Sequence, residues 1–371
     1  MGSTPAQSSI VSFAKQPAKV GRGGTYNVAD YTWYKFNTLE NGLGTVQDQQ
    51  VFPPESGGPL TPRGAYKQAK FFGGVVTVIP RLESTLGFLL KAAMGSASTV
   101  SGVKADGSAA VGVNTHIFRF DPAGAANQPW MTVRRHIPTP GSSNYFGEIG
   151  FDCKIGMFDL TIPAMGKLVS RIQMVGRDVV YDPASNAWSY ANATFDDELS
   201  SPDSGRGYFK IGGVEYPTIG ASFQLMNGLT TPQNEMIIGD FSPDDFVALT
   251  RAAQIQFVYK YENADLYRTL LGGDPNATEW SSLPFVKDTV GATYALQARF
   301  EAPGNIGATA FPYALEIRAN KVTVAVTGPI ELQPGNIITQ TFVLTVLTDK
   351  NTAVDYLQFI IENDEPAATY A

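Results

Sequence analysis

Cysteine and histidine are almost missing from this sequence of 371 residues, which contains one cysteine, Cys153, and two histidines, His116 and His136. A single cysteine excludes an intrachain disulfide framework and any metal site built from several cysteines. Two histidines are too few for a histidine-rich metal centre. The sequence therefore gives no support to a disulfide-stapled module or a multi-cysteine zinc site, and we predict neither a metal nor another cofactor.

Long apolar runs and an excess of basic residues are missing as well. No stretch approaches the roughly 18 uninterrupted apolar residues of a membrane-spanning helix, and the first residues lack the basic and apolar regions of a secretory signal. The 27 basic residues are outnumbered by 34 acidic ones, which gives a formal net charge of −7. Because nucleic-acid binding through phosphates requires clustered Lys and Arg, we predict no specific DNA binding and no membrane association.

Motifs that carry catalysis are also absent. The sequence contains no P-loop, no G-x-S-x-G elbow, no H-E-x-x-H and no C-x-x-C. His116 lies in an alternating strand-like stretch, His136 follows two arginines that disfavour its use as an acid, and Cys153 has no identifiable base. Neighbouring acids at 196–198 and 244–245 are more typical of solvated loops than of a carboxylate pair. These absences favour a structural or binding protein over an enzyme.

The residues that are abundant predict β-structure. There are 37 Gly, 24 Pro, 22 Phe and 16 Tyr residues, a composition typical of many strands joined by turns. Apolar and polar residues alternate in 255–261 and 342–347, which is the spacing of half-buried strands. The run 75–79 is apolar on both faces and predicts a central strand. Two stretches, 82–94 and 262–271, have leucines at helical spacing and end before a glycine.

The two halves of the chain resemble each other. Each predicted helix has two leucines four residues apart, and in each half an Arg-Phe pair follows the second of them, Leu90 or Leu270, by 29 residues, at Arg119 and Arg299. An Asn-Gly-Leu tripeptide, which contains a strong hairpin-turn signal, occurs upstream at 41–43 and 227–229. The offsets between these matched features are 180 and 186 residues. We therefore predict an internal duplication.

The duplication divides the chain into five segments. The stretch before residue 30 is rich in Ser, Ala, Gln and Gly without periodicity, and the middle of the chain has a second stretch rich in Pro, Gly and Asp. The predicted segments are a flexible N-terminal arm (1–29), a first β domain (30–182), a loop-rich link (183–210), a second β domain (211–363) and a C-terminal tail (364–371).

The order of these motifs resembles that of the long tail tube proteins of tailed bacteriophages, chiefly the non-contractile, siphovirus-like type. The motifs that carry the resemblance are LGFLLKAAMG, HIFRF, PWMTVRR, KIGMFDLTIP, FQLMNGL and YENADLYRTLLGG. They cover roughly residues 30–350. The resemblance implies a mainly β fold with two tandem, internally duplicated β-sandwich or barrel domains of tail-tube type, each with a short flanking helix.

The resemblance also implies a structural virion protein and no enzyme. Its subunits would join their sheets into rings, and the rings would stack into the hollow tube that conducts genomic DNA to the host without binding it specifically. The implied partners are further copies of the chain and the tape measure, tail terminator and distal tail proteins, with assembly in the cytoplasm of the host bacterium. Because such tubes have sixfold rings, two domains per chain predict three chains per ring with pseudo-sixfold symmetry.

Long loops after the first hairpin strands usually mediate ring stacking in this family. Here the corresponding loops are 46–65 and 230–247. The residues predicted to form these inter-ring loops are Pro53, Pro54, Glu55, Gly57, Gly58, Pro59, Asp244 and Asp245.

Two other interpretations stay open at this point. The chain could be the inner tube protein of a contractile tail or injection system, which a neighbouring sheath gene would indicate. It could also be a carbohydrate-binding β-sandwich adhesin that uses exposed aromatic residues such as Trp130, Trp188 and Trp280. An adhesin module should remain monomeric, whereas a tube protein should form rings or polymers.

Overall fold

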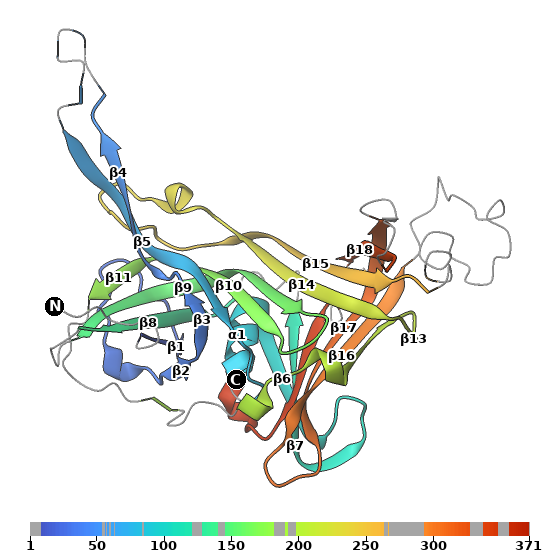
Figure 1. Ribbon diagram of the computed structural model, residues 1–371. Coiled ribbons are helices and arrows are strands. Elements are labelled where there is room, and N and C mark those ends of the chain that lie inside the picture. Colours follow the sequence, from blue (N-terminus) through green and yellow to red (C-terminus); the bar gives the residue numbers. More distant parts are fainter. Residues whose placement is uncertain are drawn as a thin grey trace.

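The protein is mainly β, as the sequence predicts. The computed structural model describes residues 9–53, 56, 58, 61–62, 64–83, 85–120, 128–139, 145–181, 190–191, 198–262, 266, 293–326, 337–347 and 356–370. Within these residues, nineteen strands are linked into one continuous hydrogen-bonded network (Figure 1). Every pairing between the strands is antiparallel.

The strands are distributed over both halves of the chain. Those of the first half are β1 (Ile10–Gln16), β2 (Tyr34–Phe36), β3 (Thr38–Asn41), β4 (Gly44–Val51), β5 (Ala65–Val78), β6 (Gly95–Val103), β7 (Ala109–Phe120), β8 (Trp130–Pro138), β9 (Tyr145–Ile162), β10 (Val169–Gly176) and β11 (Asp178–Tyr181). Those of the second half are β12 (Gly207–Ile211), β13 (Val214–Glu215), β14 (Thr218–Leu229), β15 (Ala248–Lys260), β16 (Tyr294–Asn305), β17 (Pro312–Val326), β18 (Thr339–Val346) and β19 (Gln358–Asn363). The helical elements are α1 (Thr85–Met94) and the short 3-10 turns η2 (Val28–Asp30), η4 (Glu198–Ser200), η5 (Ser204–Arg206), η6 (Pro232–Glu235) and η9 (Ala367–Tyr370).

Alternating apolar residues form the strands because a strand directs successive side chains to opposite faces. In β15, Ile255, Phe257 and Tyr259 are buried while the residues between them face outward. Residues 75–78 of the predicted central strand lie in β5. Val76 pairs with β10 on one side and with β3 on the other, and it is fully buried. Both predictions are confirmed.

The helix predicted at 82–94 is α1, which begins at Thr85. Nine of its ten residues are buried, so the leucine stripe lies in the core. Gly95 ends the helix with φ of +92°, a conformation that glycine adopts without strain. Of the helix predicted at 262–271, Leu266 is helical and buried, and most of the remaining residues lie outside the described part of the chain.

One hydrophobic core runs through both halves. The buried apolar side chains of β5, α1 and β9 belong to the same packed cluster as those of β14, β15 and β17. The ring of Phe359 on β19 meets Phe158 of β9 edge-on at 6.1 Å and Phe223 of β14 at 6.4 Å. The core is therefore continuous across the two predicted β domains, whose boundaries stay a prediction.

The order of strand pairing repeats along the chain. In the first half, β1 pairs with β2 and β8, β8 with β9, β9 with β10 and β11, and β5 with β4 and β10. In the second half, β12 pairs with β13 and β16, β16 with β17, β17 with β18 and β19, and β15 with β14 and β18. We call β1, β2, β4, β5 and β8–β11 the first unit and β12–β19 the second unit. Matched in chain order, the two units have the same pairings.

The two units are joined by strand pairing. Residues 157–162 of β9 pair with 221–226 of β14. In addition, β7 of the first half, which belongs to neither unit, pairs with β19. The first junction creates a sheet that runs β4-β5-β10-β9-β14-β15-β18-β17, with four strands from each unit. We call these eight strands the central sheet.

The N-terminal arm prediction is wrong for residues 10–16. These residues form β1, which pairs along its whole length with β8 and buries Val11 and Phe13 at 1% exposure each. The short strand escaped the sequence analysis because the apolar residues Ile10, Val11, Phe13 and Ala14 do not alternate.

The predicted C-terminal tail also contributes to the core, because Tyr370 is only 2% exposed. Within the predicted link, the structure places the 3-10 turns η4 and η5 and the start of β12.

Neither Asn-Gly pair forms a hairpin turn, contrary to the sequence analysis. Asn41-Gly42 separates β3 from β4, which both pair with β5. Asn227 lies within β14 and donates its side-chain amide to the carbonyl oxygens of Ala93 at 2.8 Å and Ile155 at 3.0 Å.

The match between Arg119 and Arg299 is also wrong. Arg299 lies on β16, and in the repeated pairing order β16 corresponds to β8, whereas Arg119 lies on β7.

Candidate assembly surface

The β4–β5 hairpin extends away from the rest of the molecule (Figure 1). In the described part of the chain, β4 pairs only with β5, so its outer edge presents unpaired backbone groups. Near the tip, the rings of Phe52 and Tyr66 lie 5.1 Å apart, and the N–H of Phe52 donates to the Gly64 carbonyl at 2.9 Å. Val51 and Phe52 are 49% and 53% exposed. Apolar side chains held in water by an ordered hairpin are typical of an interaction surface.

Half of the predicted inter-ring residues can be placed. Pro53 and Gly58 lie at the tip of this hairpin and are exposed. Asp244 and Asp245 lie in the 230–247 loop between β14 and β15. The other four predicted residues lie outside the described part of the chain; they are Pro54, Glu55, Gly57 and Pro59.

The 230–247 loop has an ordered shape of its own. The Thr230 N–H donates to the Val247 carbonyl at 2.9 Å, and the Val247 N–H donates to Thr230 Oγ1 at 3.1 Å, which closes the base of the loop. Higher up, the Asp244 N–H donates to the Glu235 carbonyl at 2.9 Å. These bonds fix the loop without help from another chain.

The two predicted acids bind cations of the same chain instead of facing open solvent. Asp245 Oδ1 lies 3.1 Å from Nζ of Lys154, a side chain only 9% exposed, and accepts from Trp130 Nε1 at 3.4 Å. Lys154 also donates to the Phe246 carbonyl at 2.7 Å. Asp244 is 3.2 Å from Lys19 and is more exposed. Sequence analysis missed these ion pairs because their partners are distant in the sequence.

A third acid of the loop, Asp240, is paired in the same way. Its Oδ2 lies 3.4 Å from Arg177 and 3.5 Å from Arg22. Beside it, the N–H of Lys70 on β5 donates to the Phe241 carbonyl at 2.7 Å. The loop, which belongs to the second unit, is thus fastened onto the first unit at its base and at its tip.

Asp152 orders the N-terminal segment that supplies two of these cations. Its fully buried carboxylate accepts from the N–H groups of Val20 at 2.7 Å and Gly21 at 2.9 Å, and from the side-chain amide of Gln16. The Asp152 N–H donates to Gln16 Oε1 at 3.0 Å. Because a buried carboxylate needs such partners, Asp152 fixes the path of the chain after β1.

The outer side of the 230–247 loop is apolar. Ile238 is fully exposed and Phe241 is 69% exposed. The exposed apolar residues of the loop and the start of β15 are Ile237, Ile238, Phe241, Val247 and Leu249. With the acids turned onto the first unit, the loop presents mainly carbon to the outside.

The central sheet has one face in the core and one open face of uncharged polar character. The open-face side chains of its middle strands include Met157, Asp159, Thr161, Arg171, Gln173, Ser222, Gln224, Met226, Gln254, Gln256, Val258, Lys260, Thr341, Val343 and Thr345. Of the charged members, Asp159 and Arg171 face each other on β9 and β10. Burial raises the pKa of the Asp159 carboxyl, and Arg171 acts against that shift.

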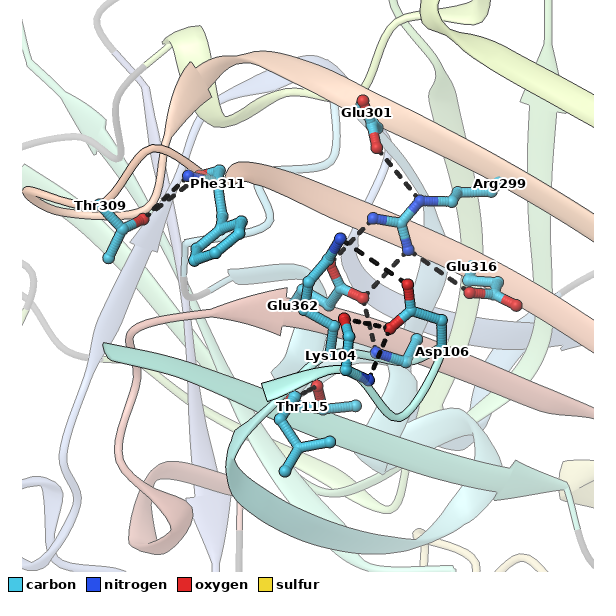
Figure 2. A network of polar contacts seen from close by, with 12 residues as sticks. Lys104, Asp106, Thr115, Arg299, Glu301, Thr309, Phe311, Glu316 and Glu362 are labelled. Atoms are coloured by element: carbon cyan, nitrogen blue, oxygen red, sulfur yellow. Dashed lines mark hydrogen bonds and ion pairs between the residues drawn. The ribbon is translucent and has the colours of Figure 1, made fainter. Parts of the chain in front are cut away.

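A second polar cluster joins the β6–β7 hairpin of the first half of the chain to the β16–β17 hairpin of the second unit. Figure 2 shows Arg299 of β16 between three carboxylates, at 2.9 Å from Glu362, 3.4 Å from Glu316 and 3.2 Å from Glu301. Burial alone would lower the pKa of the Arg299 guanidinium, but the Glu362 and Glu301 carboxylates raise it overall. Glu362 also accepts from the N–H of Ala105 at 2.7 Å, in the turn of the first-half hairpin. The cluster is a structural joint between the two halves of the chain.

The candidate catalytic groups are packed into the core. His116 is fully buried between Thr99 and Asn363, and Cys153 is a buried thiol whose pKa burial raises well above its usual value. His136 is buried in β8. Among the residues with described positions, no group of three or more His, Cys, Asp or Glu side chains could hold a metal ion. None of the described helices is long and apolar enough to cross a membrane.

Residues 7–345 of the sequence match the family described as phage tail tube protein. The chain belongs to this family. The match spans almost the whole chain, from before β1 into β18, so the protein is a structural component of the phage tail and of the virion. No curated protein matches the sequence. The tail tube family accounts for the missing catalytic motifs, and the features that remain to be explained are the exposed hairpin, the fastened loop and the repeated units.

Proposed function

We propose that this tail tube protein polymerises into stacked rings that form the hollow channel through which genomic DNA leaves the phage. The observation that carries the proposal is the central sheet, which crosses both units and buries one face while leaving a polar face open. A sheet with two unpaired edges can be extended by further copies until it closes into a barrel, which removes the edges.

The open face supports a channel that does not hold DNA. Gln, Ser and Thr are its commonest polar residues, Asp159 and Arg171 face each other, and the ammonium of Lys260 lies 3.7 Å from the Glu262 carboxylate. Tight DNA binding needs a cluster of cations that replaces the counterions of the phosphates. With a net charge of −7 per chain, a ring offers DNA no such cluster.

The repeated pairing order supports an internal duplication with three chains per ring. Each unit contributes four strands to the central sheet, so one chain supplies the strands of two equivalent subunits. Three chains would then complete a ring with pseudo-sixfold symmetry. The division into β domains at 30–182 and 211–363 belongs to the same proposal.

The partners that we propose are further copies of the chain, the tape measure protein inside the tube, and the terminator and distal tail proteins at its ends. Assembly would take place in the cytoplasm of the host bacterium. The inner tube of a contractile tail is the second candidate, because the same fold serves both, and a sheath gene beside this one would favour it.

Imaging of purified protein by negative stain at high concentration tests the polymerisation. We expect hollow tubes or rings. Deleting residues 50–60, at the end of the β4–β5 hairpin, should block tube growth and leave the circular dichroism spectrum and the melting temperature unchanged, because the described residues among them are exposed. Normal tubes from this folded variant would reject the role of the hairpin, and a strictly monomeric wild-type protein would reject the proposed function.

A further inference from the structure

The two units of one chain are joined by antiparallel pairing of β9 with β14, which shows how one unit can bind another. On β9, residues 157–162 pair with β14 on the edge that faces away from β10. The equivalent strand of the second unit is β17. Beyond Val322, which is the last residue of β17 that faces β16, the same edge of β17 has no partner in the described residues. β4, the equivalent of β14, likewise lacks a partner on its outer edge in that part of the chain.

We infer that these two open edges bind each other between copies of the chain. β17 beyond Val322 pairs antiparallel with β4 of a second copy, in the arrangement that β9 and β14 have within one chain. This inference rests on the proposed self-assembly and names the strands that carry it. By this equivalence, the strand that matches the open edge of β17 is β4. Because β4 and β17 of one chain lie at opposite ends of the eight-stranded central sheet, the β4 that pairs with β17 belongs to a second copy.

The contacts of the loops support the same joint. The 230–247 loop of the second unit lies on the first unit, with Phe241 bound to Lys70 and Asp245 to Lys154. The equivalent segment of the first unit is the end of the β4–β5 hairpin, which extends away from the rest of the molecule (Figure 1). In the proposed joint this end would lie on the second unit of another copy, as the 230–247 loop lies on the first unit within one chain.

The register of the joint follows from the paired strands. Ser170 and Gln340 are each the buried second residue of their strand, β10 or β18, and they face the ends of β5 and β15, so we treat these two positions as equivalent. Counting from them, Met157 of β9 corresponds to Ala325 of β17, and Met226 of β14 corresponds to Val46 of β4. Met157 and Met226 face each other within the chain, so Val46 and Ala325 should face each other between copies. Both residues are exposed in the single chain.

Cysteine cross-linking of the full-length protein tests the inference. Val46→Cys and Ala325→Cys are made as separate single variants, assembled together under tube-forming conditions and oxidised with diamide. The pair Val46→Cys and Thr323→Cys covers a register shift of two residues, the smallest shift that keeps both side chains on the same face of the sheet. We expect covalent dimers in the mixture and none in either variant alone. The native Cys153 should stay unreacted because its thiol is fully buried.

The internal junction supplies the positive control. A chain with both Met157→Cys and Met226→Cys should form its disulfide within one chain and keep the mass of a monomer on a non-reducing gel. Tubes that assemble from the mixed variants without covalent dimers, for either pair, would overturn the inference and leave the proposed function in place. Failure of the variants and of the wild-type protein to assemble would overturn both. A chain carrying Val46→Cys and Ala325→Cys together should give covalent species of two or three chains.

Discussion

Asp152 combines an unusual backbone conformation with a buried charge. It has φ of 52° in the middle of β9, where that strand leaves β8 and β11 and joins β10 and β14. A residue other than glycine in this conformation is strained by about 1 kcal/mol or more. The carboxylate compensates by binding the chain segment after β1. The strain and the hydrogen bonds therefore lie at the point where β9 passes from its pairing with β8 and β11 into the central sheet.

Replacing this residue should destabilise the fold. Asp152→Ala leaves the N–H groups of Val20 and Gly21 without their acceptor and keeps the backbone strain, so we expect the free energy of unfolding to fall by about 2–4 kcal/mol. Asp152→Gly loses the same hydrogen bonds but relieves the strain, and should cost about 1 kcal/mol less than the alanine variant. Urea denaturation measures both. Glu215→Ala, at an exposed site on β13, serves as the control, and equal effects of the alanine and glycine variants would contradict the argument.

His116 should make the stability depend on pH. Burial lowers its pKa below the usual value of 6.5, although the hydrogen bonds to Asn363 and the Glu365 carbonyl oppose that shift. The folded protein thus binds a proton less readily than the unfolded chain. The contribution of the neutral ring is present in full above about pH 6.5 and is lost as the pH falls below that value.

The measurement is the urea midpoint at pH 7.5 and at pH 5.5. The wild-type protein should lose more stability between these values than His116→Gln, which cannot titrate but can still donate to Asn363. Identical losses in both proteins would show that His116 does not contribute to the pH dependence.

At the scale of elements, the 230–247 loop gives a sharp comparison between two adjacent acids. Asp245→Ala leaves the ammonium of Lys154, which is nearly buried, without its carboxylate, so the free energy of unfolding should fall by about 1–3 kcal/mol. Asp244 forms an exposed ion pair with Lys19, and Asp244→Ala should change the stability by no more than about 0.5 kcal/mol. Hydrogen exchange of residues 236–247 should speed up strongly in the first variant only. Equal exchange rates in the two variants would refute the fastening of the loop through Asp245.

The sequence was informative about elements with a regular pattern. The alternation at 255–261 and the leucine spacing at 82–94 predict β15 and α1 because burial on one face is what produces such patterns. The β1 strand was missed because it is buried on both faces. The Asn-Gly signals failed because the buried amide of Asn227 binds two carbonyl groups of the core and holds the chain extended.

The candidate site was predicted only as two long loops. The acids Asp244 and Asp245 were correctly located on the second of these loops, but their ion pairs with Lys19 and Lys154 could not be predicted, since no local pattern links residues so far apart. Asp240 was missed for the same reason. The exposed apolar residues of the loop also carry no signal of their own, because exposure depends on where the loop packs.

At the scale of the whole molecule, two units of identical pairing order share one core and one central sheet. Within the described residues this sheet ends in two open edges, at β4 and at the end of β17. Open edges of this kind are a hazard for a free protein and an advantage for a subunit, because another copy can pair with them. In the proposed assembly, the molecule would be a ring segment that supplies two of the repeating positions.

Cryo-electron microscopy of the assembled tube measures the number of chains per ring and thereby tests the central claim most directly. We predict three chains per ring with pseudo-sixfold symmetry, and alternating joints of β9 with β14 within a chain and of β17 with β4 between chains. Six chains per ring, each using only one of its units in the channel wall, would contradict the account.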